Sequence, residues 1–229
     1  MTFEYSPFGW PEPGAAWLEA TEFLDHEHPA VRAFAHDAVG DARGTREKAV
    51  RLFDAVRDRI RYDPYHIRMK PEWFRASTVL QDGRAFCIPK AVLLAAAARA
   101  VGIPSAVGLS DVTNHLNSPK LRERMGGREI FLDHGWAALC IDGKWLKASP
   151  AFNAELCARM KVPPTDFDGE HDAVLQAMDA QGRQQMTYLR DHGVWSDLPY
   201  ERIRLDFEGY YPGSLWLAGP SATEFGAGN

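Results

Sequence analysis

The feature that most constrains this chain is a run of apolar, helix-forming residues at positions 88–101. Alanine, valine and leucine dominate the run, and all sides of the helix that it would form are apolar. Such a helix is stable only when it is buried, so the run predicts a helix at the centre of a globular core. Gly102 suits the left-handed residue that ends a helix, and Pro104 prevents continuation.

The composition is typical of a globular protein. The 229 residues are 45% hydrophobic and 25% charged, with a net charge of −5, and a chain of this length buries roughly 70% of its unfolded surface. Basic residues are scattered and outnumbered by acidic ones, which argues against nucleic acid as a ligand. The apolar stretch at 91–98 is shorter than the ~20 residues that cross a bilayer. Residues 1–14 lack the pattern of a secretory signal, so we expect a cytoplasmic protein that does not enter membranes.

The cysteines do not predict disulfides or a metal site. Cys87, Cys140 and Cys157 are few and widely spaced, and they form no C-x-x-C pair, so we expect free thiols. His26 and His28 lie near acidic residues but lack the i, i+4 spacing of helical metal ligands. The sequence therefore predicts no metal and no cofactor, and it does not indicate an oligomeric state.

The order of patterns predicts a single α+β domain over residues 1–229. Residues 1–63 are expected to form helices near 18–24, at 29–40 and at 45–60, because apolar residues recur there at helical spacing. Residues 76–153 form the expected core, with a strand from 105 to 109 and a loop at 110–129 that holds a short helix. Residues 131–141 and 144–149 predict two strands of a hairpin. Residues 154–229 are expected to wrap the core, with helices near 172–180 and 183–191.

Cys87 stands at the start of the predicted central helix. Free backbone N–H groups and the helix dipole favour a thiolate there, and a thiolate is a nucleophile. The alternative is a free cysteine that merely packs in the core.

His134 is the candidate base for this thiol. If Asp142 and Gly143 form the hairpin turn, His134 lies on the same strand face as Trp136, with Ser149 and Asn153 as diagonal neighbours across the ladder. Period-two alternation places Asp133 on the opposite face and excludes it as the partner of the imidazole.

These residues resemble a known family. Gly83-Arg84-Ala85-Phe86-Cys87, the apolar helix and Gly102-Ile103-Pro104 are similar to the cysteine segment of the transglutaminase-like family. Asp133-His134-Gly135-Trp136 followed by Asp142-Gly143-Lys144-Trp145 resembles its histidine strand, and Ile60-Arg61-Tyr62-Asp63 also fits. The resemblance implies a papain-like α+β fold, in which the cysteine-bearing helix packs on an antiparallel sheet, and a Cys-His-Asp triad for acyl transfer.

The chain departs from the family pattern at the third member of the triad. Ser149-Pro150 stands where the family usually has Asp-Pro, and Ala85 stands where glycine is common. We favour Asn153 as the residue that orients the imidazole, as asparagine does in papain-type sites. Ser149, a bound water, Asp166 and Asp168 are the alternatives.

Other residues are candidates for binding the reacting group. The backbone N–H of Cys87 and the side chain of Gln81 are the expected oxyanion donors. The aromatic candidates for lining an acyl groove are Tyr62, Trp73, Phe74 and Trp136.

The sequence thus predicts a thiol-dependent hydrolase or acyltransferase for peptide, amide or other acyl substrates. Peptidase or amidase activity is favoured over protein cross-linking, because nothing in the sequence suggests calcium sites or accessory domains. The main alternative is an inactive binding or scaffold module that keeps the fold. An arylamine acetyltransferase-type enzyme would use the same triad, but the sequence shows no signature for binding acyl-CoA.

Overall fold

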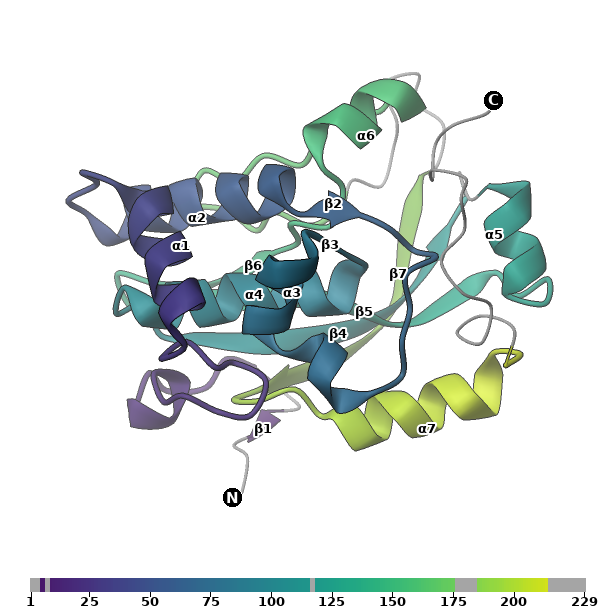
Figure 1. Cartoon of the computed structure of the whole chain (residues 1–229), viewed down its shortest axis with the longest axis horizontal. Coiled ribbons are helices and arrows are strands. Elements are labelled where there is room, and N and C mark those ends of the chain that lie inside the picture. The colour runs from purple at the N-terminus through teal and green to yellow at the C-terminus, as the bar shows by residue number, and fades with distance from the viewer. Residues whose placement is uncertain (1–4, 7–8, 116–117, 176–184, 214–229) are drawn as a thin grey trace.

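A computed structural model describes residues 5–6, 9–115, 118–175 and 185–213. Its elements in chain order are β1 (Tyr5–Ser6), a 3₁₀ turn η1 (Ala15–Trp17), α1 (Pro29–Val39), α2 (Thr45–Arg59), β2 (Arg61–Tyr62), η2 (Pro71–Phe74), α3 (Ala76–Asp82), β3 (Arg84–Ala85), α4 (Cys87–Ala100), β4 (Ser105–Asn114), α5 (Pro119–Arg124), β5 (Ile130–Ile141), β6 (Lys144–Ala148), α6 (Ala154–Met160), β7 (Met186–Trp195) and α7 (Tyr200–Tyr210) (Figure 1). None of the described helices is long and apolar enough to cross a membrane.

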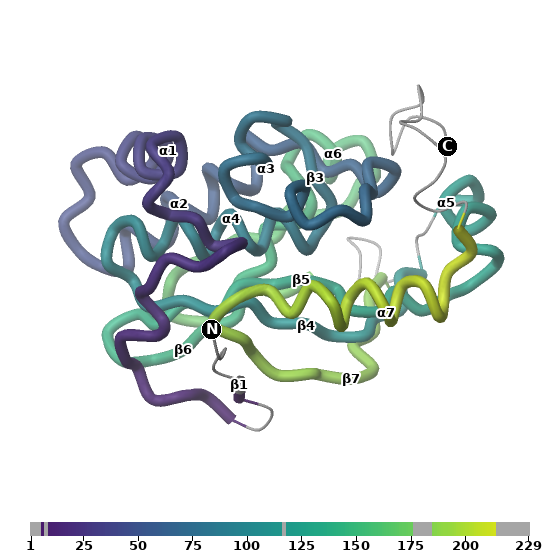
Figure 2. The backbone as a smooth tube through the Cα atoms, turned by 60° about the horizontal axis from the view of Figure 1, so that its bottom comes forward, coloured from purple at the N-terminus to yellow at the C-terminus, as the bar shows by residue number. Residues whose placement is uncertain are grey.

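A five-stranded antiparallel sheet carries the fold. Its strand order is β1-β7-β4-β5-β6, and β2 and β3 form a separate parallel pair. Helices α1 to α4 lie on one side of the sheet, and the segment that leads from β1 to α1 runs round to the other side (Figure 2). The protein is therefore of the α+β class, with the cysteine-bearing helix packed on an antiparallel sheet.

The central helix is confirmed. In α4, every residue from Ile88 to Arg99 is buried, and Gly102 has the left-handed φ of 82° that ends the helix. Its two buried cations are held by carbonyl oxygens. Lys90 Nζ donates to the carbonyls of Arg57 and Ile60 at the end of α2. Arg99 donates to three carbonyls, those of Glu19, Ser105 and Ser196.

The hairpin is also confirmed. Ile141 pairs with Lys144 and Cys140 with Trp145, and the pairing continues as far as Ala137 with Ala148. Asp142 and Gly143 both have positive φ, as a type I′ turn requires. The turn chemistry therefore fixes the register of the strand that carries His134.

Several expected elements differ from the structure. Helices α1 and α2 form as predicted, but residues 18–24 form no helix and consist of a turn, bends and irregular backbone after η1. The helix expected near 183–191 is wrong over residues 186–191, which belong to strand β7, and residues 183–184 lie outside the described residues. β7 pairs with β4 and completes the sheet, so tertiary pairing overrides the local pattern. Residues 176–180 of the other expected helix lie outside the described residues, and no helix forms at 172–175.

Helix α4 approaches the sheet most closely at Gly135 of β5. A Cβ built on Gly135 would lie 2.6 Å from the Cα of Ile88, in the first turn of α4. Only glycine allows this backbone-to-backbone approach. The contact places the start of α4 directly against the residue that follows His134.

Replacing Gly135 with alanine is expected to destabilise the protein by about 1–3 kcal/mol, because the new methyl group forces the helix and strand apart. Urea denaturation of the purified protein measures the change. The matched control is Gly209→Ala in α7, where a Cβ meets no other atom within 4 Å. Equal stability of the Gly135 variant and wild type would contradict the close approach.

Candidate active site

Cys87 is the first residue of α4, and Phe86 occupies the N-cap position without a side-chain cap. The backbone N–H groups of the first helical turn therefore have no partner within the helix. The backbone N–H groups of Gly135 on β5, of Ile88 and of Cys87 lie near the sulfur and act to lower the pKa of the thiol. The local sequence thus aims backbone donors at the thiol.

His134 lies on β5 after a distortion of the strand. Asp133 has a left-handed φ of 55°, and the β4–β5 register shifts between Ser110 and Val112. The His134 side chain is buried, with Nε2 3.3 Å from Ser149 Oγ, and its ring meets the Tyr188 ring edge-on at 6.3 Å. Both contacts restrict how the imidazole can turn.

Cys87 and His134 line the same small pocket, of about 40 Å³. No hydrogen bond joins Cys87 Sγ to the ring among the described residues. The pocket is apolar apart from these two groups and two tyrosines. The remaining lining residues are Tyr62, Pro64, Ile67, Phe86, Leu121, Met125, Phe131, Leu132, Phe207 and Tyr211.

Burial decides the charge state of both groups. It raises the pKa of the Cys87 thiol to about 11, although the three backbone donors pull it the other way. It also lowers the pKa of His134 to about 4. Desolvation thus outweighs the helix N-terminus, so burial in this fold opposes the thiolate that the helix position by itself favours. Burial therefore favours the neutral form of both the thiol and the imidazole.

Ser149, not Asn153, lies at the imidazole. Asn153 Oδ1 accepts a hydrogen bond from the Tyr62 backbone N–H and makes none with His134. Asn153 reaches the imidazole only if the hairpin extends to residue 153, whereas the strand pairing ends at Ala148 and Asn153 is the N-cap of α6.

The acidic alternatives lie elsewhere. Asp166 pairs with Arg57, and Asp168 pairs with His171 at the surface. The carboxylate of Asp133 contacts Arg202 on α7, and no contact with the His134 ring is present. Ser149 is thus the hydrogen-bonding side chain that the structure places at Nε2.

Two further candidates lie away from the pocket. Gln81 is exposed near the end of α3 and does not line the pocket of Cys87, so its placement gives no support to an oxyanion role. Trp136 belongs to a second hydrophobic cluster, where its indole N–H donates to Ser110. Trp136 therefore does not line the pocket that contains Cys87 and His134.

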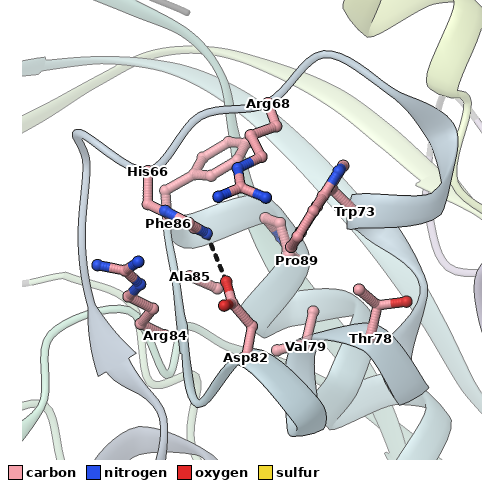
Figure 3. Close-up of a pocket in the computed structure, with 10 residues that line it drawn as sticks. All are labelled: His66, Arg68, Trp73, Thr78, Val79, Asp82, Arg84, Ala85, Phe86 and Pro89. Atoms are coloured by element: carbon pink, nitrogen blue, oxygen red, sulfur yellow. Dashed lines mark ion pairs between the residues drawn. The ribbon is translucent and has the colours of Figure 1, made fainter. Parts of the chain in front are cut away.

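A second pocket lies behind Phe86, which lines both. It has room for about one water, at about 10 Å³, and Trp73 is one of its walls. In Figure 3, His66 points to Asp82 of α3, with which it forms an ion pair. Residues 66–68 contribute to both pockets. Ile67 lines the pocket of Cys87, whereas His66 and Arg68 line the pocket of Asp82.

Sequence reasoning missed part of the pocket. Phe207 and Tyr211 line the pocket and come from α7 and its end, which the sequence does not predict. Tyr188 contacts the His134 ring without lining the pocket, and it comes from the strand expected as a helix. Leu121 and Met125 belong to the short helix α5 and its C-cap. These residues carry no motif, and only the tertiary fold brings them to Cys87.

The raised thiol pKa predicts how Cys87 reacts with iodoacetamide. Because only the thiolate reacts, the alkylation rate is expected to rise about tenfold per pH unit from about pH 7 to pH 10. Mass spectrometry of the Cys87 peptide measures it, in a Cys140→Ser, Cys157→Ser protein whose fold is checked by circular dichroism. A rate that levels off below about pH 8 would show an activated thiolate instead.

Comparison with solved structures gives remote similarities. A candidate cysteine protease from Cytophaga hutchinsonii matches with a TM-score of 0.45 and 14% identity, over 58% of this chain and 40% of that chain. A candidate protease from Parabacteroides distasonis matches with a TM-score of 0.39 and 23% identity, over 61% and 27%. The arylamine N-acetyltransferase from Mycobacterium abscessus matches with a TM-score of 0.40 and 13% identity, over 58% and 46%. The chain covers less than half of each of these proteins.

No curated protein matches the chain. The family comparison is more informative. The model of the transglutaminase-like superfamily matches residues 32–150, just over half of the 229 residues, and this range includes Cys87, His134 and Ser149. The protein therefore belongs to the transglutaminase-like superfamily.

Proposed function

We propose that this protein is a thiol-dependent hydrolase or acyltransferase in which Cys87 is the nucleophile and His134 the general base. The observation that carries the proposal is that Cys87 and His134 face one apolar pocket, with backbone N–H groups directed at the sulfur. The family membership supports the same class of chemistry.

The proposed reaction begins from the neutral pair. As Cys87 Sγ attacks the acyl carbon, its proton passes to His134, and the carbonyl oxygen becomes an oxyanion. Ser149 lies at Nε2, so Nδ1 is the nitrogen left to take the proton. The imidazolium then protonates the leaving group, which breaks the bond to the acyl carbon and leaves a thioester on Cys87. Water or an amine attacks the thioester, His134 accepts its proton, and the thiol is restored.

The first turn of α4 supplies the oxyanion donors of this proposal. The backbone N–H of Cys87 is free of intrahelical bonds, and removing one such donor typically costs about 3–4 kcal/mol of barrier. The helix N-terminus also favours negative charge that develops nearby. Gln81 has no part in the proposed site.

The pocket lining favours a substrate whose acyl group is apolar. Lining side chains such as Leu132 and Phe207 can pack against carbon, while none of the lining residues carries a permanent charge. A charged acyl group would lose its hydration without gaining a partner. We therefore propose amides, peptides or esters with an apolar acyl side as substrates.

Removal of the proposed nucleophile or base should abolish the activity. Cys87→Ala and His134→Ala are each expected to lower kcat/KM by about 10²–10⁴-fold on 4-nitrophenyl esters and 4-nitroanilides of apolar acids. Ser149→Ala should lower it about tenfold, since it removes one hydrogen bond to the imidazole. The matched control is Ser105→Ala, which removes a buried serine hydrogen bond to Ala95 outside the pocket.

A negative result in these assays would contradict the proposed enzymatic function. A folded wild-type protein that turns over none of these substrates, and whose Cys87 forms no thioester with them by mass spectrometry, would favour the scaffold interpretation. Addition of an amine such as glycinamide separates hydrolysis from acyl transfer.

The pH dependence provides an independent prediction. With a thiol pKa of about 11 and an imidazole pKa of about 4, kcat/KM should stay constant from about pH 5 to pH 9. It should fall only as the pH drops through about 4, because an imidazolium cannot accept the thiol proton. Stopped-flow assays in overlapping buffers measure the profile. A half-maximal value near pH 6.5 would show that His134 titrates like an exposed imidazole.

A further inference from the structure

Three potential metal ligands converge next to the proposed base but outside its pocket. Asp111 on β4, Asp133 on β5 and His192 on β7 each offer a ligand atom, and these atoms all lie within 4.8 Å of one another. The strands are irregular at this level, because β4 shifts register against β5 between Ser110 and Val112 and against β7 between Asp111 and Val112. The bulges turn side chains of three strands toward one point.

One ligand atom in this cluster is buried without a partner. Asp133 is 1% exposed, and its Oδ2 atom has no hydrogen-bond partner. Its Oδ1 atom contacts Arg202 at 3.3 Å. Asp111 Oδ1 accepts from the Asp133 backbone N–H and lies 2.9 Å from His192 Nε2. A buried carboxylate oxygen without a donor is costly, and a cation would satisfy it.

The charges of the cluster do not balance. Arg202 on α7 pairs with both Asp133 and Asp206, so these two carboxylates share one guanidinium, and Asp111 adds a third carboxylate whose ligand oxygen lies within 4.8 Å of that of Asp133. The local excess of negative charge favours a bound cation.

We propose that Asp111, Asp133 and His192 bind one divalent transition-metal ion, of the Zn²⁺ or Mn²⁺ type. One imidazole nitrogen and two carboxylates suit these ions, and water completes the coordination. Ca²⁺ fits less well, because it takes six to eight oxygen ligands. Asp133 directly precedes His134, so the ion would fix the strand distortion that sets the direction of the imidazole.

Calorimetric titration of the full chain with Mn²⁺ and Zn²⁺, after removal of metal by a chelator, tests the proposal. We expect one ion per chain, and Asp111→Asn should weaken the affinity by about tenfold or more. Asparagine can still accept from the Asp133 N–H, so the change removes charge with little loss of structure. The matched control is Asp168→Asn, because Asp168 forms an exposed pair with His171 but has no third ligand. It should bind the ion like wild type.

Two further variants separate this site from the pocket of Cys87. His192→Gln, with its fold checked by circular dichroism, should also weaken binding, whereas Cys87→Ala should keep the full stoichiometry and affinity. The proposal is overturned if wild type binds neither ion, if the Asp111 and His192 variants bind as tightly as wild type, or if Cys87→Ala abolishes binding. None of these readouts depends on enzymatic activity, so they stand whether or not Cys87 is a nucleophile.

Discussion

The close contact between Gly135 and the first turn of α4 is the constraint on which the candidate site depends. It brings a backbone N–H of β5 to the Cys87 sulfur, and it fixes where His134 stands relative to the helix. The approach is possible because α4 can be buried, and α4 can be buried because its two cations are bound by carbonyl oxygens. The packing that buries the apolar helix α4 therefore also determines where Cys87 and His134 lie.

Burial also sets the chemical character of the pair. A thiol and an imidazole that are both kept neutral need a mechanism in which proton transfer accompanies nucleophilic attack. In the reaction that we propose, charge develops only when a substrate is in place, next to the backbone N–H groups at the start of α4. Such preorganisation needs no rearrangement of solvent during the reaction.

Much of the fold can be predicted from local signals in the sequence. The alanine-rich helix, the type I′ turn at Asp142 and Gly143, and helices α1 and α2 follow from periodicity and turn chemistry. Strand β7 does not, because it is stabilised by its pairing with β4, far away in the sequence. The remote residues of the pocket, such as Phe207, carry no local signal for the same reason.

The residues of the candidate site also fall into those that the sequence predicts and those that depend on the tertiary fold. Cys87 and His134 stand out in the sequence, but the choice between Ser149 and Asn153 depends on where the hairpin ends. Simple alternation along β5 could not anticipate the left-handed residue at Asp133. The sequence does not predict the cluster of Asp111, Asp133 and His192, because its members lie on three strands and form no motif.

The second hydrophobic cluster joins residues before α1 to the face of the sheet opposite α4. Trp17 packs edge-on against Trp145, and Trp10 stacks on the same ring, so the segment before α1 covers the face of the sheet that α4 leaves open. This segment precedes the range that the family model matches. A fragment trimmed to that range would leave indole and alanine surface open to water and prone to self-association. We therefore expect a stable fragment to need the segment with Trp10 and Trp17 in addition to residues 32–150.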